Sequence, residues 1–143
     1  MEKAFEHFAV LGVINPVSTS TASNTTVIDV SLFEKIVFLI NIGAVTATGT
    51  VNFVVKGDTA SGGSFSTTVT GKSITQLDST DSNKQVIVEV DANALGTQGF
   101  RYIRGTLTAA TAASVVSVVA LGFGCTYGNA NQFNLSTVDE IVA

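Results

Sequence analysis

The sequence is short of the side chains that carry most enzyme chemistry. Its 143 residues include one histidine, one cysteine and no tryptophan. A single cysteine excludes an intrachain disulfide and any multi-cysteine zinc site. A single histidine excludes a two-histidine metal site within one chain. We therefore expect a protein that is not an enzyme and that has no metal centre and no cofactor.

Charged side chains are also scarce. They make up 13% of the residues, against about 25% in an ordinary globular protein. The seven Lys and Arg residues form no basic run, and the net charge is −4. This composition disfavours a nucleic-acid partner, which needs clustered cations. A weakly charged surface is typical of a subunit that is covered in an assembly, although a small monomer with a Ser/Thr/Asn surface is the alternative.

No hydrophobic run has the length of a membrane-spanning helix. The most apolar stretch, residues 109–124, is shorter than the roughly 20 residues required, and it contains Thr111, Ser114 and Ser117. Residues 1–16 make a poor signal peptide, because two glutamates precede a short apolar run. We expect no membrane segment and synthesis in the cytoplasm.

The residues that are abundant favour β-structure. Valine and threonine are the two commonest, and both are β-branched. Apolar or alternating segments predict strong strands, and two weaker ones are more polar. The strong strands are expected over residues 34–43, 50–57, 84–90, 100–108 and 113–122, and the weaker ones over 64–70 and 73–77. The valine pairs within residues 113–122 favour a strand that is buried on both faces.

This strand pattern predicts a single all-β domain, an antiparallel β-sandwich of the jelly-roll or Ig-like kind. We expect the sandwich over residues 27–125. Residues 1–26 are predicted to form an N-terminal arm and polar linker, and residues 126–143 a C-terminal tail. Residues 8–14 could instead form an edge strand that stops before Pro16.

The chemically active side chains have plainer interpretations than catalysis. His7 and Cys125 lie near opposite ends of the sequence, which disfavours a Cys–His nucleophile, and we interpret both as packing residues. Acidic groups at Asp78, Asp81, Glu89 and Asp91 could form a calcium site, but the loop over residues 77–83, which contains Asp78 and Asp81, lacks the spacing of an EF-hand. A solvated turn is the favoured interpretation of the segment that contains them.

The strand layout resembles that of the small head-decoration, or cement, proteins of tailed bacteriophages. A strand ending in Asn-Ile-Gly-Ala-Val-Thr at 41–46 is followed by Gly-Thr-Val-Asn-Phe-Val-Val-Lys-Gly-Asp at 49–58. A valine strand then leads to Phe-Arg-Tyr-Ile-Arg-Gly-Thr-Leu-Thr at 100–108, and an apolar strand ends at Leu121-Gly122. The resemblance spans roughly residues 27–123.

The resemblance implies a virion structural protein on the capsid exterior. Such a protein binds the major capsid protein, clamps neighbouring capsid subunits and forms a homotrimer. From the residues themselves we select four candidate interface residues. Arg101 and Arg104 are selected because arginine is favoured at interfaces, and Phe5 and Phe8 because they lie in a terminal segment that is free to reach a neighbour. The alternative is a tail- or fibre-associated β-sandwich that binds host-surface glycans.

Overall fold

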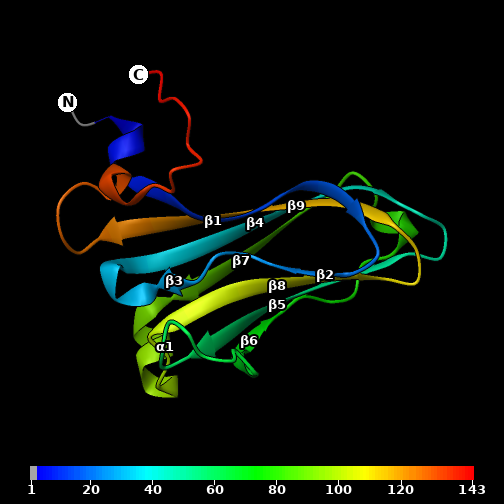
Figure 1. Ribbon diagram of the computed structural model, residues 1–143, viewed down its shortest axis with the longest axis horizontal. Coiled ribbons are helices and arrows are strands. Elements are labelled where there is room, and N and C mark those ends of the chain that lie inside the picture. Colours follow the sequence, from blue (N-terminus) through cyan, green and yellow to red (C-terminus); the bar gives the residue numbers. More distant parts are fainter. Residues whose placement is uncertain (1–2) are drawn as a thin grey trace.

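A computed structural model describes residues 3–143 as two antiparallel sheets packed face to face (Figure 1). The strands are β1 (Phe8–Thr19), β2 (Ala22–Asn24), β3 (Ile28–Asp29), β4 (Phe33–Val45), β5 (Thr50–Asp58), β6 (Thr67–Ser73), β7 (Gln85–Asp91), β8 (Tyr102–Ala110) and β9 (Ser114–Cys125). The helical segments are α1 (Ala92–Gln98) and the short 3-10 turns η1 (Ala4–Glu6), η2 (Val30–Leu32), η3 (Ser79–Asp81) and η4 (Ala130–Phe133).

The strand order identifies the sandwich as a jelly roll. One sheet has the order β1-β9-β4-β7 and the other β2-β8-β5-β6, with β3 also pairing with β8. If β2 and β3 are counted as one interrupted strand, each of the eight strands except β6 lies in the other sheet from the strand before it, while β5 and β6 are neighbours in one sheet. This is the double Greek-key pattern of that fold. The predicted all-β sandwich is therefore confirmed, and the topology selects the jelly roll over the Ig-like alternative.

The core lies between the sheets and follows the alternation of the strands. In β5, Val51, Phe53 and Val55 are buried while their neighbours are partly exposed. The ring of Phe53 meets that of Phe38 from β4, with centroids 5.4 Å apart. Gly105 of β8 makes room for this pair, because a Cβ there would lie 2.5 Å from the Phe53 ring. The volume of the two phenylalanine rings is thus accommodated by a glycine on the neighbouring strand β8.

The prediction that residues 1–26 form an arm and linker is wrong for the part that the structure describes. Strand β1 is the edge strand of the four-stranded sheet and pairs with β9 from Phe8 to Thr19. It also contributes Ala9, Leu11 and Ile14 to the core. The edge-strand alternative is correct in kind, but β1 continues through Pro16, where its register with β9 shifts. Residues 1 and 2 of the predicted arm lie outside the described residues.

The C-terminal tail is partly attached to the sandwich. The backbone N–H of Val10 donates to Asn134 Oδ1 at 2.7 Å, and the N–H of Leu135 donates to the Val10 carbonyl at 2.9 Å. Ala130 of η4 is buried. In Figure 1, η1 and the tail lie together at the same end of the molecule. The tail therefore occupies the outer edge of β1 at Val10, where both backbone groups are no longer free to pair with another strand.

Candidate interaction surfaces

The outer face of the β1-β9-β4-β7 sheet is largely apolar on β1, β9 and β4, whereas β7 presents one apolar side chain, Ile87, between Gln85 and Glu89. One cross-strand row runs Val13–Val119–Leu39–Ile87, as the pairing registers show. We call this surface the apolar face. Its outward apolar side chains are Phe8, Val10, Val13, Val37, Leu39, Ile87, Val115, Val119, Leu121 and Phe123, and they are bordered by outward Lys35, Asn41, Gln85, Glu89 and Ser117. Ile87 is 68% exposed, Val115 41% and Leu39 37%.

The outer face of the opposite sheet has a different chemistry. Along β5 and β8 its cross-strand pairs are largely polar: Asn52 is opposite Thr108, Val54 is opposite Thr106 and Lys56 is opposite Arg104. One outer face of the sandwich is thus largely apolar and the other largely polar. Burial of the core between the sheets does not require this difference. Contiguous exposed apolar surface generally marks a contact with another molecule.

The sequence signal for the apolar face is the pair of valine doublets within residues 113–122, which predicted a strand buried on both faces. Strand β9 buries alternate residues, such as Val116 and Val118, and leaves Val115 exposed. The prediction that this strand is buried on both faces is therefore wrong within one chain. Strand β4 also carries apolar side chains on both faces, at Ile36 and Val37 for example. Such strands are typical of a sheet that is covered on both sides, so the pattern indicates that another surface packs on this face.

Of the four candidate interface residues, the two phenylalanines lie at the same end of the molecule. Phe8 begins β1, and its ring contacts that of Phe123 with centroids 6.1 Å apart. It is part of the apolar face. Phe5 lies in η1, just before β1, and the ammonium of Lys3 is 5.8 Å from its ring centroid. Both phenylalanine side chains are half-buried.

Arg101 makes an ion pair within its own chain. Its Nε and Nη2 donate to Oδ1 and Oδ2 of Asp29 at 3.3 and 3.0 Å. Burial on its own would raise the pKa of Asp29, but hydrogen bonds from Arg101 and Ser31 outweigh it and hold that pKa below its usual value. The guanidinium also lies over the Tyr102 ring. Arg101, the residue before β8, is thus linked by the ion pair to Asp29 at the end of β3.

Arg104 has no such carboxylate partner among the described residues. Its guanidinium lies 4.8 Å from the ring centroid of Phe65, which is buried. Phe65 has a φ of 50°, a left-handed conformation that is unusual for a residue other than glycine. Asp58 holds the loop in this shape by accepting hydrogen bonds from the N–H groups of Ala60 and Phe65. These bonds lower the pKa of Asp58.

His7 and Cys125 lie along the same shallow hollow, with Glu6 and Asn129. The pairing of β1 with β9 brings them together, so their separation in the sequence was a poor guide to their separation in space. The Cys125 thiol donates to the Tyr127 carbonyl, with Sγ and O 3.3 Å apart. The thiol is therefore engaged with the backbone in this arrangement.

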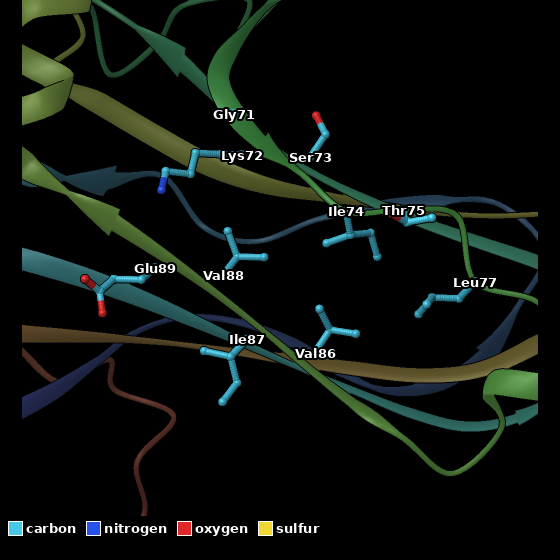
Figure 2. Close-up of a pocket in the computed structure, with 10 residues that line it drawn as sticks. All are labelled: Gly71, Lys72, Ser73, Ile74, Thr75, Leu77, Val86, Ile87, Val88 and Glu89. Atoms are coloured by element: carbon cyan, nitrogen blue, oxygen red, sulfur yellow. The ribbon is translucent and has the colours of Figure 1, made fainter.

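A groove of about 440 Å³ runs between the edge strands β6 and β7 (Figure 2). Its apolar lining includes Ile74, Leu77 and Val86, whose side chains project into the space between the two strands. Lys72 and Glu89 lie at one end. No aromatic side chain lines this groove, so it lacks the stacking platform that a glycan site usually has.

The described residues also form no metal-binding cluster. Among residues 3–143, no three or more His, Cys, Asp or Glu side chains gather in a way that could hold an ion. The segment with Asp78 and Asp81 forms η3, in which Asp78 accepts from the Thr80 N–H. None of the helices described is long and apolar enough to cross a membrane.

No protein-family model matches the chain, and no curated protein matches it. The residues that our sequence analysis missed are those of the apolar face other than Phe8, together with Lys56 and Phe65. For the apolar face the signal was present, because strands with apolar residues at consecutive positions need cover on both sides. For Lys56 and Phe65 no signal was available, since the strand register and the loop conformation bring them to Arg104.

Proposed function

We propose that the protein is a virion structural protein that binds the outer capsid surface and clamps neighbouring major-capsid subunits. The apolar face is the structural observation that supports the assembly part of this proposal, because it gives a small, weakly charged jelly roll a contact surface that its own fold leaves uncovered. The proposal also rests on the resemblance of the strand layout to phage head-decoration proteins.

We assign the apolar face to contact between copies of this chain. Strands lie about 4.8 Å apart and outward residues about 7 Å apart, so the apolar positions of three neighbouring rows, which number four, three and two, cover roughly 300 Å². A stable interface buries about 800 Å² per partner, with an apolar centre and a polar rim. The apolar face would supply the centre. Asn41 and Gln85, which hydrogen-bond to each other beside it, would supply part of the rim.

A homotrimer is the assembly that we infer. A ring of three joins the apolar face of each copy to a different surface of the next and closes on itself. It would present the same capsid contacts three times, so that individually weak contacts act together. An oligomer that binds assembled capsid better than free subunits stabilises the shell by mass action, without any reaction.

The test of the self-contact is the mass of the protein in solution. Light scattering should give about three times the chain mass of 14.7 kDa for the wild type. Ile87→Glu places a charge in the apolar face at a position already 68% exposed, so it should leave the fold intact and weaken association by at least about tenfold. Val142→Glu, a matched change in the exposed tail, should have no effect. A wild-type monomer at micromolar concentration would contradict the assignment.

A further inference from the structure

We propose that Lys56 and Arg104 form a carboxylate-binding site on the outer face of the β2-β8-β5-β6 sheet, and that its ligand is an acidic side chain of another protein. This site lies on the opposite side of the sandwich from the apolar face. The site can be tested on the free chain, so a failure of this proposal and a failure of the capsid proposal can be told apart.

The first observation is a pair of like charges in register. Lys56 of β5 and Arg104 of β8 are direct cross-strand partners with side chains on the same outer face. Directly opposite residues have Cβ atoms about 5 Å apart, and like charges there destabilise a sheet. A protein with a net charge of −4 and only seven cations could avoid this repulsion easily. An anion that binds between the two cations would convert it into attraction.

The second observation is that the acidic side chains at this end of the face are already engaged. Asp58, two residues from Lys56, accepts hydrogen bonds from the backbone of its own loop. Asp29 is paired with Arg101. Within the part of the chain that the structure describes, neither Lys56 nor Arg104 forms an ion pair, whereas Lys35, Lys84 and Arg101 each have a carboxylate partner.

The third observation is that Arg104 is held in place before any ligand arrives. Its guanidinium lies on the buried Phe65 ring, and the Asp58 hydrogen bonds fix the loop that carries Phe65. The Arg104 Nε is buried and has no acceptor among the described residues. A planar guanidinium that is already oriented loses less entropy when it binds a carboxylate. Its terminal nitrogens and the Lys56 ammonium would then share the carboxylate oxygens.

The test is an NMR titration of the free protein at low salt. The buried Nε–H of Arg104 should give an observable resonance that reports on the site. A short peptide of glutamates should shift it saturably, whereas a glutamine peptide of equal length should not. Lys56→Gln and Arg104→Gln should each weaken glutamate-peptide binding by about fivefold, the scale of partly exposed ion pairs. Lys72→Gln, which removes a cation from the β6–β7 groove, should leave binding within twofold.

A second measurement on the same variant separates a binding site from a structural role. Lys56→Gln removes the repulsion, so it should raise the melting temperature of the free protein while weakening peptide binding. An unchanged affinity in Lys56→Gln, or an equal loss in Lys72→Gln, would overturn the proposal. Tighter binding of inorganic phosphate than of the glutamate peptide would overturn the choice of a protein carboxylate.

Discussion

Arg101 and Asp29 join two segments that are far apart in sequence by a two-pronged ion pair, with Nε–Oδ1 and Nη2–Oδ2 distances of 3.3 and 3.0 Å. Sequence analysis selected Arg101 as an interface residue on its type alone. In the structure it already has a carboxylate partner, while Arg104 has none among the described residues. The two arginines of the same short motif therefore have different surroundings: Arg101 is paired with a carboxylate, and Arg104 lies on the Phe65 ring.

The Asp29 ion pair predicts how stability depends on pH. The pKa of Asp29 is below its usual value in the folded chain. A carboxyl group of this kind stabilises the fold above its unfolded pKa, and the contribution is lost as the pH falls through the folded pKa. The pKa values of Asp58, Asp78 and Asp81 are lowered in the same direction. We expect stability to be nearly flat near neutral pH and to fall below about pH 4.

Urea unfolding at pH 7 and pH 3 checks this dependence. Asp29→Asn should lower the free energy of unfolding at pH 7. It should also reduce the difference between the free energies of unfolding at pH 7 and pH 3, because it removes one carboxyl group whose pKa is lower in the folded chain. Asp139→Asn, in the exposed tail, serves as the matched control and should behave as the wild type. A difference between pH 7 and pH 3 as large in Asp29→Asn as in the wild type would contradict the role of the ion pair.

Gly105 should tolerate no side chain. A Cβ at this position would lie 2.5 Å from Phe53 and 3.1 Å from Phe38, in the centre of a densely packed core. We expect Gly105→Ala to reduce the free energy of unfolding by about 1–3 kcal/mol, as overpacking does. Gly62→Ala is the control, since a Cβ there meets nothing within 4 Å. Equal stability of the two variants in urea unfolding would show that the sheets can separate to accommodate the methyl group.

Strand β1 should be essential to folding. Removing residues 1–15 deletes Ala9, Leu11 and Ile14 from the core and exposes the edge of β9. We expect the truncated chain to be unfolded or aggregated by circular dichroism and size-exclusion chromatography. Deletion of residues 139–143, all exposed, should leave the chain folded. If the chain without residues 1–15 is soluble and folds cooperatively, this segment is a dispensable arm and the prediction is wrong.

Attachment of the tail to β1 makes a smaller contribution. Asn134 accepts a hydrogen bond of 2.7 Å from the Val10 N–H. Asn134→Ala should cost about 1 kcal/mol of stability, the usual net value of such a bond. Hydrogen exchange at the Val10 amide should become faster, while the Leu39 amide in the central strand β4 should keep its protection. Unchanged exchange at Val10 would mean that this bond does not hold the tail.

Much of the fold could be predicted from local pattern, because alternation and apolar runs are local properties. Strand β4 is central, as its continuous apolar run indicates, and β5 alternates as its sequence does. The register was out of reach, because it depends on which residues meet across the sheets. For that reason the sequence showed neither the opposition of Lys56 and Arg104 nor the proximity of His7 and Cys125.

The N-terminal segment was misjudged for a different physical reason. Polar residues such as Ser18 and Ser23 are typical of a linker, but at the edges of the sandwich they are solvated on one side while their backbone groups pair in the sheet. Strand pairing is a backbone property, so a polar stretch can belong to a sheet when a long neighbour such as β9 extends alongside it.

The most direct measurement of the central claim is binding to assembled heads. If the proposal holds, capsids of the virus that encodes the chain can be stripped of the protein, mixed with purified protein, sedimented and imaged by cryo-electron microscopy. The proposal predicts saturable co-sedimentation and three-fold density on the outer surface, bridging neighbouring major-capsid subunits. Wild-type protein that stays in the supernatant, or density found only at the tail, would contradict it.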